Sequence, residues 1–301
     1  MADSIKLPES DPQKLLQYIS DAFPSLSWKS FKVIRHGWDH EVIILDDKLV
    51  FRFPNDDEYL ELLESEIKVL KQLEPLVDID VPRYQYVAPD SSFAGYPMIH
   101  GNELTRNYFD GLDKRSRSSI ARQLAKFLST MHTIDATNDM YLSVPPSDTA
   151  EAQVWIKSEA EHNLHRVLTA DDFKITQSII NEVDELMAQK LSKVLIHGDV
   201  YESHLFWNES TGRLGLIDFS DMNQGDPAFD FAEIHFYGKD FVDEVYENYN
   251  GPKDSTFLDR AWAYQRWVGI LLMADHFINH KLSFDESREI FDRFKNKPKR
   301  S

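Results

Sequence analysis

The prevailing spacing of the apolar residues changes near residue 104 of this chain of 301 residues. Before that point, short apolar runs such as residues 42–45 and 49–53 alternate with polar breaks, a pattern typical of strands. After it, apolar residues recur every three or four positions, as in residues 120–131 and 175–186, which is helical spacing. A chain with this order of elements is expected to fold as a sheet-rich part followed by a helix-rich part, an α+β organisation.

The first part of the chain is predicted to form a small antiparallel sheet that carries helices. Residues 12–24 and residues 59–73 each place their apolar side chains on one helical face. Residues 46–48 join two strands as a hairpin. The extended segments at residues 84–87 and 96–99 are expected to complete the sheet.

The charge of the chain restricts its partners. It carries 51 acidic and 33 basic residues, a formal net charge of −18 at pH 7. Such a surplus repels nucleic acids and anionic membranes and attracts cationic small molecules. The absence of cysteine excludes disulfides, thiolate metal sites and a cysteine nucleophile. The start of the chain lacks a secretory pattern, and the apolar run at 268–274 is too short to span a bilayer. We therefore expect a cytoplasmic monomer that binds neither nucleic acid nor membrane.

One stretch, residues 193–230, interrupts the helical pattern with two apolar runs that lead directly into charged residues. Asp199 follows the first run, His204 comes five residues later, and Asp218 follows the second run. Loops at strand ends carry functional side chains on a rigid base. Phosphoryl transfer to a hydroxyl needs a carboxylate that orients the hydroxyl and ligands for a metal on the triphosphate. These three residues are candidates for those roles, although a His-x-Asp pattern alone is also common on surface turns.

In this stretch the sequence resembles the aminoglycoside and macrolide phosphotransferases, enzymes that share the two-lobed architecture of protein kinases. The resemblance runs from about Phe31 to the C-terminal helices and is most specific at residues 197–204 and 216–230. It implies a protein-kinase-like fold with an antiparallel sheet lobe and a mainly helical lobe. The implied limits are 1–97 for the N-terminal nucleotide-binding lobe, 98–103 for the hinge and 104–301 for the C-terminal lobe.

The resemblance also implies roles for the three residues. Asp199 is then the catalytic base and Asp218 a magnesium ligand. His204 stands where the family usually has Asn. Some aminoglycoside 2''-phosphotransferases and the macrolide kinases are similar in having His at this position. The resemblance therefore implies that His204 is the second metal ligand. Magnesium prefers oxygen ligands, and an imidazole must be neutral to bind a metal directly. His197 is expected to brace the backbone of this loop.

On the nucleotide side, Arg52 matches the family's phosphate-contacting lysine, and Glu66 matches the glutamate that pairs with it. Arginine is always charged and can bind two oxygens at once, so it is chemically able to replace the lysine. The loop at residues 35–40 contains one glycine and is a weak nucleotide signature. A strand arginine that faces solvent remains the alternative interpretation of Arg52.

The segment that follows matches the hinge that holds the purine. Pro97 and Ile99 fall at the positions whose backbone groups bind the base, and Tyr96 falls at the gatekeeper position. A tyrosine there is associated with GTP over ATP in similar enzymes, although a core tyrosine fits the pattern equally well. The resemblance therefore implies GTP, or ATP, as the phosphoryl donor, together with Mg²⁺.

The sequence leaves the acceptor open. Aminoglycosides are polycations, which the net charge favours, but Glu233 is the one acid in an aromatic run, residues 231–238, that is equally similar to macrolide kinases. Glu233 is a candidate contact for a substrate amine. We place a 2''-type aminoglycoside kinase first, with a macrolide 2'-kinase or a metabolic amino-alcohol or sugar kinase as alternatives. A silent nucleotide-binding protein is a further alternative, because Arg52 replaces a lysine and Ser220 replaces a glycine.

Overall fold

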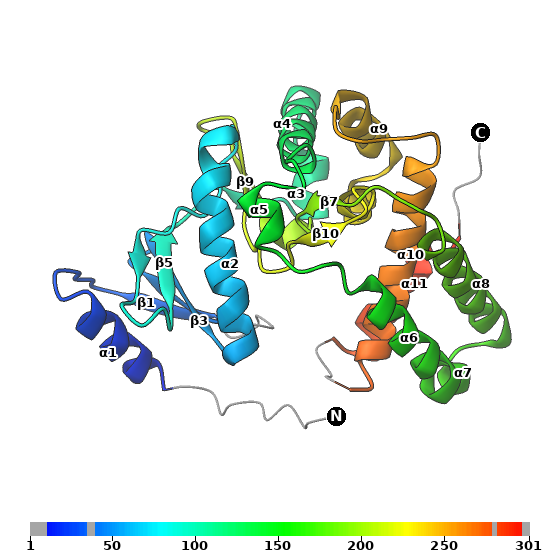
Figure 1. Ribbon diagram of the computed structural model, residues 1–301, viewed down its shortest axis with the longest axis horizontal. Helices are drawn as coiled ribbons and strands as arrows, with labels where there is room; N and C mark the ends of the chain where they lie inside the picture. The colour runs from blue at the N-terminus through cyan, green and yellow to red at the C-terminus, as the bar shows by residue number, and fades with distance from the viewer. Residues whose placement is uncertain (1–10, 35–39, 279–281, 297–301) are drawn as a thin grey trace.

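The computed structural model describes residues 11–34, 40–278 and 282–296. The weak nucleotide signature at residues 35–40 lies outside these residues except for His40. The described chain forms a sheet-containing N-terminal lobe and a larger, mainly helical C-terminal lobe (Figure 1). The α+β organisation expected from the apolar spacing is therefore confirmed.

The N-terminal lobe is built on an antiparallel five-stranded sheet with the order β1-β2-β3-β5-β4. The expected hairpin joins β2 to β3, and both Asp46 and Asp47 adopt a φ of 52°, as a tight type I′ turn requires. The two extended segments are β4 and β5, which pair with each other. The strands are β1 (Phe31–Ile34), β2 (His40–Leu45), β3 (Leu49–Pro54), β4 (Tyr86–Val87) and β5 (Ala94–Pro97).

The two faces of this sheet have different partners. Helix α1 (Pro12–Ala22) covers one face, where its apolar side chains pack with residues such as Phe51. Because strand side chains alternate, Arg52 projects from the opposite face. Helix α2 (Asp57–Leu73) lies on that side and places Glu66 against Arg52. The sheet accordingly lies between α1 and α2 in Figure 1.

The C-terminal lobe is mainly helical. Its two expected long helices are present as α4 and α8, and α10 is buried on most of its surface. The α-helices are α3 (Arg106–Gly111), α4 (Lys114–His132), α5 (Asp139–Leu142), α6 (Thr149–Glu159), α7 (His165–Val167), α8 (Ala170–Met187), α9 (Lys239–Asn248), α10 (Phe257–Asp275) and α11 (Phe284–Phe294). A short π-helix, Ala160–Leu164, joins α6 to α7.

Short strands in this lobe position the stretch that interrupts the helical pattern. Strands β8 (Leu205–Asn208) and β9 (Arg213–Leu216) form a hairpin, and β6 (Asn102–Glu103) pairs with β8. Strand β7 (Val194–Ile196) pairs with β10 (Asn223–Gly225). Residues 98–101 thus connect strand β5 of the first lobe to a strand of the second, and the limits given above for the lobes and the hinge stay a prediction.

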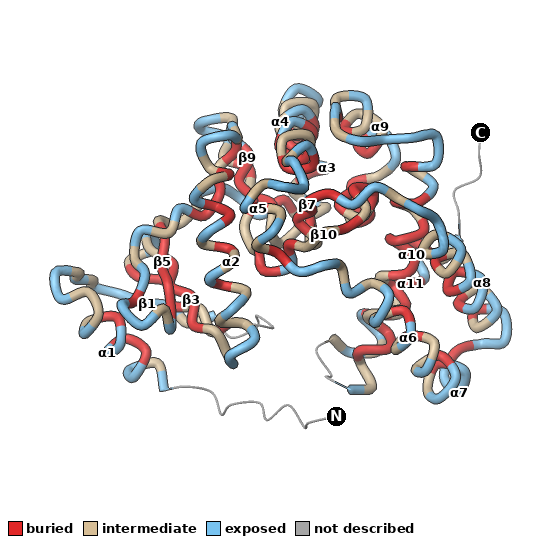
Figure 2. Tube along the Cα trace, viewed as in Figure 1, coloured by how far each residue is buried: buried red, intermediate tan, exposed pale blue. Residues whose placement is uncertain are grey.

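The largest cluster of buried apolar residues lies in the C-terminal lobe. It joins α4, the strands β7 to β9, α9 and the first turns of α10. Figure 2 shows these buried residues between the helices, with exposed residues along the outer turns of α7 and α8. Among the described residues, no helix is long and apolar enough to cross a membrane.

Candidate active site

The loop that carries Asp199 is held by a buried carboxylate. Asp230, which is 1% exposed, accepts hydrogen bonds from the backbone N–H groups of His197 (2.9 Å) and Gly198 (2.8 Å). Its Oδ2 also lies 2.9 Å from Nε2 of His132, on α4. Gly198 has a φ of 88°, and a Cβ there would lie 2.3 Å from the carbonyl oxygen of Asp221. The loop conformation therefore depends on glycine at 198 and on the carboxylate at 230.

His197 braces the same loop, as expected from the sequence. Its Nδ1 accepts a hydrogen bond from the backbone N–H of Asp199 at 3.2 Å, and its ring packs edge-on against Phe219. Complete burial lowers the pKa of His197, so the ring remains a neutral acceptor. His197 therefore acts on the position of Asp199 through the backbone.

His204 lies between the two candidate acids. Its Nδ1 is 3.1 Å from the backbone oxygen of Asp199 and 3.3 Å from Asp199 Oδ2, while its Nε2 is 3.6 Å from Asp218 Oδ2. A carbonyl oxygen only accepts hydrogen bonds, so Nδ1 carries a hydrogen. Nε2 faces a carboxylate oxygen of Asp218, and it can offer a lone pair to a metal when it carries no hydrogen.

Asp218 follows β9 in a left-handed backbone conformation, with a φ of 64°. Its Oδ1 accepts hydrogen bonds from Ser220 Oγ and from Nη2 of Arg52, both at 2.9 Å. Burial alone would raise the pKa of Asp218, but the charge of Arg52, the neighbouring His204 and the hydrogen bond from Ser220 together outweigh it, and the pKa is lowered. Ser220, which departs from the family glycine, thus supports an ionised Asp218.

Arg52 joins the two lobes through a buried network. Its Nη1 donates to both oxygens of Glu66 (2.9 and 2.7 Å), and Tyr84 Oη donates to Glu66 Oε1 at 2.9 Å. Its Nη2 lies 3.1 Å from Nδ1 of His40 and also donates to Asp218. The arginine is 5% exposed, which excludes the solvent-facing alternative. Both terminal nitrogens of Arg52 are therefore engaged by protein groups.

Three members of this network were given no role from the sequence. They are His40 on β2, Tyr84 before β4 and Ser220 after Asp218. Each of them contacts the side chain of another member of the network. His40 could have been found from the pairing register of the β2–β3 hairpin, because that register places His40 on the same face of the sheet as Arg52.

The predicted purine-binding residues form a separate group beside β9. Tyr96 is 4% exposed and packs edge-on against Tyr84 at a centroid distance of 5.1 Å. Pro97 and Ile99 are half-buried, and a Cβ at Gly215 would lie 2.5 Å from Cγ2 of Ile99. Since β9 leads to Asp218, the structure places these positions near the predicted metal ligand.

Glu233 lies at the start of the 3₁₀ turn Glu233–Tyr237, next to the catalytic loop. Burial raises its pKa well above the usual value, and the negative charge of Asp199 and a hydrogen bond to it raise the pKa further. Glu103 belongs to the same acidic surroundings, since its pKa is raised by burial and by the charge of Glu202. The structure thus brings Glu233 to Asp199, the predicted base, and gathers carboxyl groups on this side of the site.

The residues predicted to bind Mg²⁺ offer one oxygen and one nitrogen. Among the described residues, no group of three or more His, Cys, Asp or Glu side chains is arranged to hold a metal. Mg²⁺ usually takes one or two carboxylates and completes its shell with water and substrate phosphates. The lone pair of His204 and the facing oxygen of Asp218 fit a cation that arrives with a nucleotide.

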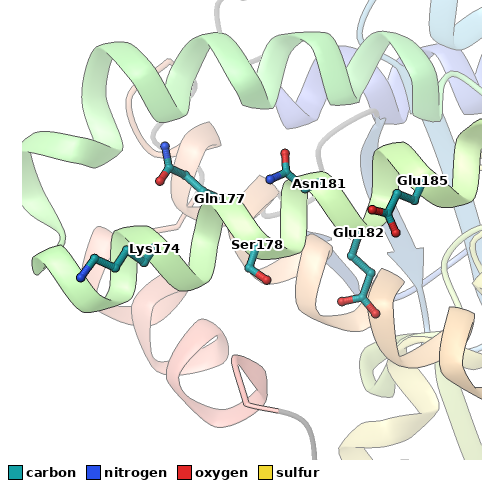
Figure 3. Close-up of a pocket in the computed structure, with 6 residues that line it drawn as sticks. All are labelled: Lys174, Gln177, Ser178, Asn181, Glu182 and Glu185. Carbon is teal, nitrogen blue, oxygen red and sulfur yellow. The ribbon is translucent and has the colours of Figure 1, made fainter.

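A hollow on the molecular surface lies away from this site. It has a volume of about 570 Å³ and is lined by polar residues of α8 alone, including Lys174, Asn181 and Glu185 (Figure 3). None of its lining residues belongs to the predicted site.

Comparisons with known proteins give a family match and a fold match. The model of the phosphotransferase enzyme family matches residues 30–266. The uncharacterized protein YcbJ of Bacillus subtilis (strain 168) is 24% identical over 214 residues, which are 65% of this chain and 66% of that protein, just under two thirds.

Two solved structures share the fold over nearly their full length. The GDP and kanamycin complex of APH(2'')-IIia has a TM-score of 0.80 at 21% identity, covering 94% of this chain and 98% of that chain. The macrolide 2'-phosphotransferase MphH from Brachybacterium faecium, as apoenzyme, has a TM-score of 0.66 at 18% identity, covering 96% of this chain and 100% of that chain. The resemblance to the aminoglycoside and macrolide enzymes, and the kinase-like fold it implied, are confirmed.

Proposed function

Because this chain belongs to the phosphotransferase enzyme family, we propose that it transfers the γ-phosphoryl group of a purine nucleoside triphosphate to a hydroxyl of an antibiotic. One observation carries the proposal, a line of contacts that crosses from one lobe to the other. It runs from Arg52 to Asp218 (2.9 Å), from Asp218 to His204 (3.6 Å) and from His204 to Asp199 (3.3 Å). A phosphate anchor, two metal ligands and a base are the groups that this reaction requires.

In this proposal Asp199 acts at the acceptor hydroxyl. The hydroxyl oxygen forms a bond to the γ-phosphorus, the bond from that phosphorus to the β,γ-bridging oxygen breaks, and the nucleoside diphosphate leaves. The hydroxyl proton passes to the carboxylate of Asp199. Mg²⁺, when held by Asp218 and His204, would neutralise negative charge on the phosphate oxygens. The backbone contacts of His197 and His204 keep Asp199 in place during transfer.

Arg52 needs a change of partners to hold the donor phosphates. Its Nη1 is engaged by the fully buried Glu66, whereas its Nη2 contacts the partly exposed Asp218. Phosphate oxygens would therefore compete with Asp218 for Nη2 and leave the buried pair with Glu66 intact. Glu66 keeps the guanidinium oriented for both states.

An aminoglycoside is the acceptor that the electrostatics favour. Burial raises the pKa values of Glu103 and Glu233, and the negative charges of Glu202 and Asp199 raise them further, so added positive charge would be stabilised on this side of the site. A polycation supplies that charge. Most of the acidic residues behind the net charge of −18 lie on the solvated surface. The proposal therefore depends on these local carboxylates and not on the net charge of the chain.

A macrolide is the second candidate, and a specific observation favours it. The ring of Tyr201 packs edge-on against Phe236 at 5.5 Å, and Phe236 contacts Phe294 at 5.0 Å. Tyr201 is partly exposed and lies near enough to Glu233 for its charge to act on the tyrosine, so its ring, backed by the buried Phe236 and Phe294, offers apolar surface to a large acceptor that carries one amine.

A transfer assay with a panel of acceptors tests the proposed function. The purified protein is incubated with γ-labelled GTP or ATP, Mg²⁺ and aminoglycosides, macrolides, amino alcohols or sugars. We expect labelled aminoglycoside, with GTP as the better donor. Labelled macrolide would move the second candidate to first place. Label on amino alcohols or sugars alone would identify a metabolic kinase, and a complete lack of transfer would contradict the proposal.

We predict that, at pH values where Glu233 is ionised, Glu233→Gln raises the KM for cationic acceptors about tenfold, because a neutral amide cannot pair with an amine as a carboxylate does. Since the pKa of Glu233 is raised, its charge appears only as the pH rises through that higher value, so the wild-type KM should fall with rising pH. The KM of the variant should not follow this pH dependence. Glu185→Gln, on the exposed face of α8, is the matched control. An unchanged KM in Glu233→Gln would remove this residue from the acceptor site.

We predict that Tyr96→Leu lowers the ratio of kcat/KM for GTP to that for ATP at least several-fold. The tyrosine is buried against Tyr84 and limits the depth available to the purine, so a smaller side chain admits either base. Tyr96→Phe keeps the ring and should keep the preference. Steady-state kinetics with both donors decide the matter, and an unchanged ratio in the leucine variant would assign Tyr96 to the core alone.

A further inference from the structure

The face of the N-terminal sheet that carries Arg52 also carries a histidine. In the β2–β3 register, His40 pairs with Pro54 and Val42 pairs with Arg52. Directly paired residues project to the same face, and that face alternates along each strand. His40 and Arg52 therefore lie on the face opposite the one that α1 covers. This is the face from which Arg52 reaches Asp218 of the other lobe.

The contact between the two residues fixes which ring nitrogen of His40 carries the hydrogen. Nη2 of Arg52 lies 3.1 Å from Nδ1 of His40. A guanidinium only donates hydrogen bonds, so Nδ1 is the acceptor. Burial and the charge of Arg52 lower the pKa of His40 to about 3, and the ring is neutral at physiological pH. Its one hydrogen must then be on Nε2.

This N–H group is buried and has no hydrogen-bond partner within the described chain. His40 as a whole is 4% exposed. A buried donor without an acceptor costs about 1–3 kcal/mol, so native proteins rarely keep one without a use. His40 and Asp218 both contact Nη2 of Arg52, at 3.1 and 2.9 Å, so the imidazole ring lies near the predicted phosphate and metal site.

We propose that the Nε2–H group of His40 donates a hydrogen bond to a phosphate oxygen of the bound nucleotide. Both terminal nitrogens of Arg52 are engaged by protein groups, whereas this donor has no acceptor among the residues that the structure describes and is fixed in direction by Arg52. A phosphate oxygen can accept the hydrogen bond that this N–H group does not make within the protein. The negative charge of the phosphate strengthens such a bond. The proposal rests on the function proposed above, since it assigns a further residue to the same nucleotide site.

Two substitutions separate this role from a role in holding Arg52. An asparagine at position 40 can present its amide oxygen near the place of Nδ1 and so still accept from Arg52, but it lacks the distal N–H. A glutamine is longer and can place an N–H near the position of Nε2. We therefore expect His40→Asn to weaken GDP binding by about tenfold or more, as expected for a lost hydrogen bond to a charged group. We expect His40→Gln to stay within a few-fold of the wild type.

Isothermal titration calorimetry with GDP and guanosine, and with ADP and adenosine, tests the proposal. The loss in His40→Asn should appear with the diphosphates and vanish with the nucleosides, and thermal denaturation should confirm that each variant is folded. Equal loss with the nucleosides would overturn the proposal, and so would His40→Asn binding like the wild type or a loss confined to His40→Gln. A wild-type protein that binds neither diphosphate would contradict the proposed function itself, and this inference with it.

Discussion

Asp199→Asn is expected to lower kcat for phosphoryl transfer by about 10³-fold, within the range of 10²–10⁴ attributed to general acid–base groups. An asparagine keeps the shape of the side chain but cannot take the hydroxyl proton. The loop itself should persist, because Asp199 is held through its backbone N–H by His197 and through its backbone oxygen by His204. Nucleotide affinity should therefore remain close to that of the wild type.

Rapid-quench assays with the preferred acceptor and calorimetry with the nucleotide measure the two quantities separately. Asp240→Asn, the same chemical change at an exposed position of α9, should leave both unchanged. If Asp199→Asn retained wild-type turnover, Asp199 would not be the base. If the wild type bound nucleotide but showed no turnover with any acceptor, the silent nucleotide-binding alternative would be correct.

The parts of the fold that the sequence predicted are those that depend on local patterns. The β2–β3 hairpin follows from Asp46 and Asp47 between two apolar runs, and α2 follows from apolar spacing that begins after a polar break. The candidate acids Asp199 and Asp218 were found because each follows a buried strand. In these cases the residues that determine the structure are neighbours in the sequence.

The contacts that the sequence could not predict join residues far apart in the chain. Asp230 accepts hydrogen bonds from Gly198 and His197, which precede it by 32 and 33 residues. Arg52 and Asp218, which form an ion pair, are 166 residues apart. The sequence assigned no role to Asp230, because no local pattern records which backbone N–H groups a buried carboxylate accepts from. The engagement of Arg52 by protein groups likewise depends on the packing of two lobes.

Asp230→Ala is expected to destabilise the protein by about 3 kcal/mol or more, because it leaves several buried donors without an acceptor and each costs about 1–3 kcal/mol. The donors are the backbone N–H groups of His197 and Gly198 and Nε2 of His132. The same change should lower kcat at least tenfold, since a loop displaced by about 1 Å can lower a rate up to about 10²-fold. Urea unfolding and steady-state kinetics measure the two effects.

Asp230→Asn tests whether the charge and both oxygens are needed, because an isosteric amide fills the same space but turns an NH₂ group toward one of the donors. We expect it to be destabilised as well, whereas a residue that merely filled space would tolerate it. Although burial alone raises the pKa of Asp230, hydrogen bonding to His132 and the loop outweighs it, and the pKa is lowered. The stability that this carboxylate contributes is therefore complete above the ordinary aspartate pKa of about 3.9 and is lost as the pH falls below it. The difference in unfolding free energy between wild type and Asp230→Ala should shrink in that acid range, and a difference independent of pH would show that the carboxylate is not what holds the loop.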